Sequence, residues 1–185
     1  HGTEPLPHNL KELCKAVVQE KADIGFAVDP DADRLAVVDE KGKPIGEEYT
    51  LVLATEGYIK TTERKETFVT NLSSTMALDK LAEKHNCTVE RSAVGEINVV
   101  QKMLELNTNL GGEGNGGVIL REAHLGRDSL VGVTMVLNRL AQSVEPVSEI
   151  MQTLPHFEMV KDRLELNRAD VCMPDPTAVF DRAKA

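Results

Sequence analysis

Three aspartates alternate along the segment DPDADR, residues 29–34, which lies between the short apolar runs IGFAV and LAVV. On an ordinary strand, Asp29, Asp31 and Asp33 would share one face and repel one another at close range. A curled loop between two strands lets the three carboxylates converge on one point, where a hard cation would offset their charge. Because all the ligand atoms would be oxygens, the pattern favours Mg²⁺ over zinc or copper.

Two other interpretations of this acidic segment stay open. In the first, the aspartates and Glu40 occupy the ligand positions of a calcium-binding EF-hand loop. That loop needs glycine at its sixth position and two flanking helices, whereas this segment has Arg34 and two apolar runs. In the second, the segment is a solvated acidic turn, although its place at the ends of strands favours a binding site. Arg34 is then either a substrate contact or the ion-pair partner of a loop aspartate.

The segment LGGEGNGGVIL, residues 110–120, holds five glycines around Glu113 and Asn115. It lacks the lysine of a P-loop. A carboxylate and an amide on a glycine frame suit a polyhydroxyl ligand, because a carboxylate accepts from hydroxyls and an amide both donates and accepts. The alternative is a glycine-rich turn with a solvated glutamate.

Two further residues are candidate phosphate contacts. Gly95 stands between an expected strand and an expected helix, where backbone N–H groups can bind phosphate, although a plain connecting turn explains it equally well. Arg127 is either an anion contact or a surface arginine. Its neighbour Asp128 is expected to cap the helix that follows.

The surrounding sequence predicts which elements position these residues. Strands that alternate with helices predict βαβ units, an α/β fold and a mixed, mostly parallel sheet. In chain order the expected elements are a helix at 9–20, strands at 24–28 and 35–38, a helix at 47–60, a strand at 67–71, a helix at 74–85, a strand at 87–92, a helix at 96–107, a strand at 116–120, and helices at 128–142 and 145–154.

Composition and charge limit the classes of partner. Among the 185 residues, 41% are hydrophobic and 28% are charged, as in ordinary globular proteins. The formal net charge of −9 argues against nucleic acid as a partner, because it repels phosphate backbones. No apolar run approaches the roughly 20 residues that span a bilayer, and no secretory pattern opens the chain, so we expect no membrane partner. Cys14, Cys87 and Cys172 form no CxxC pair, which predicts reduced thiols and a cytoplasmic protein.

The two loops together resemble the α-D-phosphohexomutase superfamily, which contains phosphoglucomutases, phosphomannomutases and phosphoglucosamine mutases. DPDADR follows a short strand, GGEGNGGVI comes roughly eighty residues later, and AVGEINVV lies between them. The resemblance covers about residues 1–150. It implies that residues 1–48 are the C-terminal part of a metal-loop domain, that residues 49–155 are a sugar-recognition domain, and that residues 156–185 are a linker toward a missing phosphate-binding domain.

The resemblance also implies site roles. The carboxylates of the acidic loop would hold Mg²⁺, and Arg34 would contact the substrate or a phosphoserine. Glu113, with Asn115 beside it, would bind sugar hydroxyls. Many relatives have Ser and His where this chain has Asn115 and Gly117, so the hydroxyl contacts are expected to differ.

The implied reaction moves a phosphoryl group between the 1- and 6-positions of a glucose, mannose or glucosamine phosphate. It proceeds through a phosphoserine and a bisphosphorylated sugar. No TASHNP-like serine motif occurs in the 185 residues, so we expect a fragment that is inactive without the other domains of its chain. A non-catalytic module that binds a sugar phosphate or a metal is the alternative.

Overall fold

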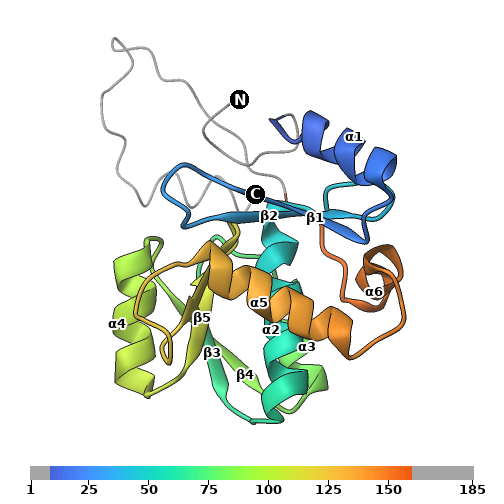
Figure 1. Ribbon diagram of the computed structural model, residues 1–185. Coiled ribbons are helices and arrows are strands. Elements are labelled where there is room, and N and C mark those ends of the chain that lie inside the picture. Colours follow the sequence, from blue (N-terminus) through green and yellow to red (C-terminus); the bar gives the residue numbers. More distant parts are fainter. Residues whose placement is uncertain (1–8, 160–185) are drawn as a thin grey trace, which may run out of the picture.

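The computed structural model describes residues 9–159, which form a small helix-and-ribbon unit above a larger α/β unit (Figure 1). In the small unit, helix α1 (Lys11–Glu20) packs on the antiparallel strands β1 (Ile24–Val28) and β2 (Leu35–Asp39). Val28 pairs with Leu35 at the end of this ribbon, so residues 29–34 form its connecting loop. The acidic segment is therefore a loop between two strands, as predicted.

The larger unit contains a four-stranded sheet with the order β4-β3-β5-β6. β3 pairs in parallel with both β4 and β5, and β5 pairs antiparallel with β6. This arrangement confirms the predicted α/β fold and its mixed, mostly parallel sheet. The elements are α2 (Glu47–Thr62), β3 (Thr67–Asn71), α3 (Ala77–Lys84), β4 (Thr88–Ser92), α4 (Glu96–Leu106), β5 (Leu110–Glu113), β6 (Gly117–Leu120), α5 (Ser129–Ala141) and α6 (Val147–Thr153).

Helices cover both faces of this sheet. Successive strand residues point to opposite faces, so Phe68 packs in the core with α2, α3 and α5, whereas Val69 packs against α4. Figure 1 shows α4 on one side of the sheet and α2 and α5 on the other. The two crossovers run in opposite directions along the sheet, and right-handed connections then place α3 and α4 on opposite faces.

The ribbon also packs directly on the larger unit. β2 is buried along its whole length, because α1 covers one face and the α/β unit covers the other. On the second face, Leu35 Cδ2 would lie 3.0 Å from a Cβ placed at Gly132 of α5. Backbone hydrogen bonds join Ile45 N to Val37 O at 3.0 Å and Ser129 N to Ala32 O at 3.1 Å. The acidic loop is thus fixed over the sheet by backbone contacts.

The glycine-rich segment differs from expectation in one respect. Sequence patterns predicted a loop that leads into a strand at 116–120, but residues 110–113 themselves form the central strand β5. Strand positions 111 and 112 are occupied by glycine, and neighbouring atoms leave no room there for a larger side chain. Glu113 therefore projects from the end of a buried strand rather than from a flexible loop.

Two other findings bear on the sequence predictions. None of the helices in the described part of the chain is long and apolar enough to cross a membrane. Cys14 and Cys87 are free thiols, whereas Cys172 and most of the predicted linker lie outside the described residues.

Candidate metal and substrate site

The acidic loop curls because its first aspartate binds the backbone of the residues that follow. Asp29 Oδ1 accepts hydrogen bonds from the N–H groups of Asp33 at 3.1 Å and Arg34 at 3.0 Å. Ala32 adopts a φ of 57° in the left-handed region, which completes the turn. As a result, one carboxylate oxygen from each of the three aspartates, including Asp31, lies within 4.8 Å of the others.

The three carboxylates differ in environment. Asp29 is buried and Asp31 is exposed. Arg34 Nε lies 3.2 Å from Asp29 Oδ2, so Arg34 forms an ion pair with a loop aspartate, one of its two interpretations from the sequence. Burial raises the pKa of Asp29, but hydrogen bonds from the Arg34 and Asp33 backbones and the Arg34 charge hold it below its usual value. Burial and the nearby Asp29 and Asp31 carboxylates raise the pKa of Asp33, although the charge of Arg127 opposes this.

These features fit a hard divalent cation. The donor set consists of carboxylate oxygens, which suit Mg²⁺. Asp33 Oδ1 is buried without a hydrogen bond, and Arg34 Nε approaches it only to 3.7 Å, so this oxygen can still accept a closer positive group. The raised pKa of Asp33 points the same way, because carboxylates that crowd together without a cation hold protons more strongly.

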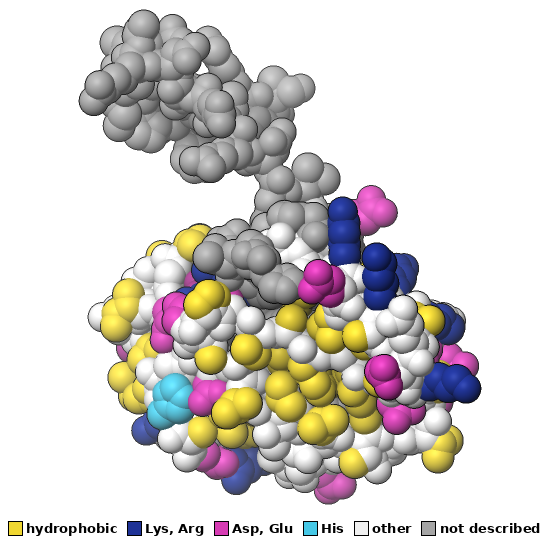
Figure 2. Space-filling view, turned by 45° about the horizontal axis from the view of Figure 1, so that its top comes forward, with side chains coloured by type: hydrophobic (Ala, Val, Ile, Leu, Met, Phe, Trp, Pro, Cys, Tyr) yellow, Lys and Arg dark blue, Asp and Glu magenta, His cyan; other side chains and the backbone are white. Residues whose placement is uncertain are grey.

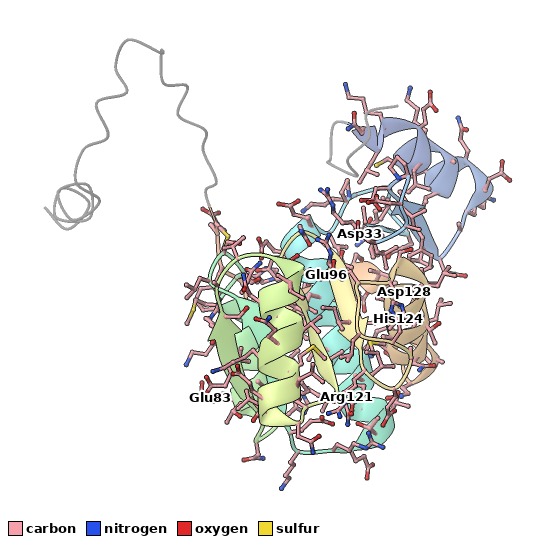
Figure 3. All side chains as sticks on the ribbon, turned by 90° about the vertical axis from the view of Figure 1, so that its left-hand side faces the viewer. Asp33, Glu83, Glu96, Arg121, His124 and Asp128 are labelled. Atoms are coloured by element: carbon pink, nitrogen blue, oxygen red, sulfur yellow. The ribbon has the colours of Figure 1, made fainter. Side chains whose placement is uncertain are left out.

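Arg127 lies at the centre of the site rather than on the surface. Its Nε donates to Glu96 Oε2 at 3.1 Å, its Nη1 donates to Glu113 Oε2 at 2.9 Å, and its Nη2 donates to Asp33 Oδ2. The backbone N–H of Arg127 also donates to Glu96 Oε1 at 3.1 Å. Only 15% of the Arg127 side chain is exposed. Figure 3 shows Asp33 and Glu96 close together where the acidic loop meets the start of α4.

Glu113 is buried and held by three donors from different elements. Its Oε1 accepts from Asn71 Nδ2 at 2.7 Å and from the Gly95 N–H at 3.2 Å, while Arg127 binds its other oxygen. Gly95 precedes α4 with a φ of 115°, a conformation that favours glycine. In this structure the Gly95 N–H therefore serves Glu113, whereas the sequence suggested it as a phosphate contact.

The turn after Glu113 is also fixed. Asn115 Oδ1 accepts from the Gly117 N–H at 3.1 Å, and Asn115 remains partly exposed. Gly114 N donates to Ser74 Oγ at 2.9 Å. Asn115 thus lies on a short turn beside Glu113 that these hydrogen bonds hold in place.

Sequence reasoning missed two members of this cluster. Asn71 lies at the carboxyl end of β3, the edge where open α/β sheets place their sites, and that position was the available signal. Glu96 is the first residue of α4 after Gly95, where an acidic residue commonly stabilises a helix N-terminus. Neither residue can be recognised as a site residue from the sequence alone. Their roles depend on contacts with distant residues: Asn71 binds Glu113, and Glu96 binds Arg127.

Comparisons with known proteins agree on the family. A family model described as phosphoglucomutase/phosphomannomutase, alpha/beta/alpha domain III, matches residues 46–157, and the corresponding domain II model matches residues 1–42. The chain is 33% identical over 160 residues to a phosphoglucomutase/phosphomannomutase of Thermococcus kodakarensis. This match covers 86% of this chain and 35% of that protein. It is 36% identical over 151 residues to a phosphoglucosamine mutase of Shouchella clausii, and this match covers 78% of this chain and 33% of that protein.

A solved structure gives the same result. A phosphoglucomutase/phosphomannomutase family protein from Burkholderia thailandensis superposes with a TM-score of 0.74 and 26% sequence identity. The match covers 84% of this chain and 34% of that structure. The chain therefore spans about a third of the length of the relatives that it matches.

Proposed function

Because the chain belongs to the phosphoglucomutase/phosphomannomutase family, we propose that a longer protein containing it moves a phosphoryl group between the 1- and 6-positions of a hexose phosphate. One observation carries this proposal above the others. The three aspartates lie 80 to 84 positions before Glu113 in the sequence, yet both Asp33 and Glu113 bind the same guanidinium. The carboxylates proposed to hold the metal and the carboxylate proposed to accept from sugar hydroxyls thus meet at one arginine.

The aspartate loop is the proposed Mg²⁺ site of this enzyme. Asp29, Asp31 and Asp33 would hold the ion through one carboxylate oxygen each. When bound, Mg²⁺ supplies positive charge that neutralises phosphoryl oxygens during transfer. Arg34 lies beside these acids, and we assign it to an anionic group of the substrate or of a phosphoserine.

Glu113 and Asn115 are the proposed sugar contacts. The Glu113 carboxylate is fixed by Asn71, Gly95 and Arg127, so it is preorganised to accept hydrogen bonds from sugar hydroxyls. A sugar that must bind in two orientations needs such a fixed acceptor, because similar hydroxyls then meet it either way. The ligand would be a glucose, mannose or glucosamine phosphate.

Other domains of the same protein are the proposed partners. Near the site, large apolar side chains are exposed within five residues of Asn71 or Gly95: Leu72 (69%), Met76 (50%), Val94 (60%) and Ile97 (64%). Hydrophobic side chains also form a continuous stretch on the face shown in Figure 2. Such surface is suited to packing against further domains. The free thiols of Cys14 and Cys87 support the cytoplasm as the proposed compartment.

A coupled mutase assay tests this proposal. The longer protein should interconvert the 1- and 6-phosphates of at least one of the three hexoses in the presence of Mg²⁺. Glu113→Gln should lower turnover on the order of 10²-fold, because a misplaced sugar reacts poorly. Glu105→Gln, on the exposed side of α4, is the matched control and should keep wild-type activity.

The 185-residue chain alone should give no turnover in the same assay. The implied phosphoserine motif does not occur in its sequence, and the chain spans about a third of its relatives. Activity of this chain by itself would contradict the proposed division of labour. Inactivity of the longer protein on all three sugars would contradict the proposed reaction.

A further inference from the structure

The guanidinium of Arg127 divides its donors among three carboxylates from three places in the fold. Nε binds Glu96 at the start of α4, Nη1 binds Glu113 at the end of β5, and Nη2 binds Asp33 in the acidic loop. A planar guanidinium presents its donors in a fixed fork. A displacement of one carboxylate therefore rotates the fork and moves the donor that holds another.

Arg127 binds only one oxygen of the Asp33 carboxylate and one oxygen of the Glu113 carboxylate. It holds Asp33 by Oδ2, while Oδ1 of the same carboxylate is buried without a hydrogen bond. Arg127 also holds Glu113 by Oε2, while Oε1 is bound by Asn71 and Gly95. One side chain thus sets the orientation of a proposed metal ligand and of the proposed sugar acceptor.

Gly117 makes this position available to Arg127. A Cβ built at residue 117 would collide with Arg127 Cδ and would lie 2.9 Å from Arg127 Cγ. Gly117 does not have a positive φ, so its backbone can accommodate other residues. The reason for glycine at 117 is therefore space: the Arg127 stem occupies the volume of a side chain at that position.

We infer that Arg127 is a positioning residue that couples cation binding at the aspartate loop to the orientation of Glu113. A cation that engages Asp33 changes the pull of this carboxylate on Nη2, and the rigid fork transmits the change to Glu113 through Nη1. By reciprocity, a ligand on Glu113 alters the affinity of the loop for the cation. The inference rests on the proposed function for the identity of that ligand, but its cation arm can be tested alone.

The experiment follows backbone amide signals of the ¹⁵N-labelled 185-residue chain by NMR while Mg²⁺ is added. In the wild type, the amides of Asp33 and Arg34 report cation binding directly. The amide of Gly95 reports the state of Glu113, because it donates to Glu113 Oε1. We expect the Gly95 signal to shift with the same midpoint as the loop signals.

Substitutions then separate coupling from simple proximity. In Arg127→Gln the loop amides should still shift at saturating Mg²⁺, whereas the Gly95 shift should be lost. Arg127→Lys should fail to restore it, because an ammonium cannot span the carboxylates as a fork does. Arg34→Gln also removes a positive charge beside Asp33, but Arg34 makes no ion pair with Glu113, so this variant should retain the Gly95 shift.

Gly117→Ala gives an independent variant that leaves every charge in place. It should displace the Arg127 side chain and abolish the Gly95 shift, and dispersed amide signals would show that the fold is intact. A Gly95 shift that persists in Arg127→Gln and in Gly117→Ala would overturn the inference, and so would a wild-type Gly95 signal that stays still while the loop signals move. If the loop signals themselves stay still in the wild type, the proposed metal site fails, and this inference fails with it.

Discussion

The backbone N–H of Leu35 donates to the carbonyl oxygen of Gly116 at 3.1 Å. Leu35 is the first residue after the acidic loop, and Gly116 belongs to the turn that carries Asn115, so this bond ties the two candidate loops together. The contact depends on glycine, because Gly116 has a φ of 89° and a Cβ there would collide with Leu35 O. The alignment of the two candidate loops thus rests on this backbone bond and on the contacts of Arg127 with Asp33 and Glu113.

Gly116→Ala should destabilise the chain and separate these loops. We expect a loss of about 1–3 kcal/mol in the free energy of unfolding, because alanine is strained at this φ and its Cβ has no space. Urea denaturation measures the loss. Gly126→Ala is the matched control: its Cβ would meet flexible side-chain atoms at 3.2 Å or more, so it should change stability far less. Equal stability of the two variants would contradict this account.

Asp31→Asn should weaken Mg²⁺ binding without unfolding the protein. Asp31 is the exposed member of the trio, so its amide should be tolerated, while the loss of a charged ligand should raise the Kd on the order of tenfold or more. Titration calorimetry with MgCl₂ measures this. Asp23→Asn removes another exposed acid, outside the trio, and should leave the affinity unchanged. Unchanged affinity in Asp31→Asn would count against the loop as a metal site.

Asp128→Ala should remove the cap of α5. Asp128 Oδ1 accepts from the N–H groups of Leu130 at 2.7 Å and Val131 at 3.1 Å, and His124 contacts its Oδ2 at 3.0 Å. Figure 3 shows His124 and Asp128 next to each other. We expect a cost of about 1 kcal/mol at pH 7.

This cost should depend on pH. Burial raises the pKa of Asp128, but the hydrogen bonds from His124, Val131 and Leu130 outweigh it and hold the pKa below its usual value. A carboxyl whose pKa falls on folding stabilises the protein above its unfolded pKa and loses this contribution as the pH falls through the folded pKa. Urea denaturation of wild type and Asp128→Ala should therefore differ at pH 7 and converge in acid. A difference that does not shrink in acid would show that the cap acts without its charge.

Arg139→Met should be costly because it removes the close partner of the buried Glu56 carboxylate and leaves Lys60 Nζ at 3.9 Å. Arg139 of α5 donates to Glu56 of α2, and both side chains are only 3% exposed. Removing one partner of a buried pair costs about 3–5 kcal/mol, whereas replacing both by apolar residues costs far less. Glu56→Leu combined with Arg139→Met should thus recover most of the stability, as measured by urea denaturation. A double variant as unstable as Arg139→Met alone would indicate that packing, not charge, dominates.

Much of the fold could be predicted because its signals are local. Short apolar runs at 24–28 and 67–71 became strands of the predicted length, and the Asp128 cap lies where expected. The strand at 110–113 was missed because its glycines imitate a loop, and only its central place in the sheet makes it a strand. The predicted domain limits of 48 and 155 stay predictions, and so do the substrate roles of the site residues.

The alternation of Asp29, Asp31 and Asp33 between two apolar runs was enough to predict that these carboxylates converge, because a curled loop between two strands can bring all three to one point. Sequence also determined that Glu113 stands on a glycine frame. Only the tertiary structure decided that Arg127 joins these features. Arg127 and Asp33 are 94 positions apart, so their contact depends on how the ribbon packs over the sheet and on the space at Gly117. Such pairings arise from packing between elements, which no local pattern of residues encodes.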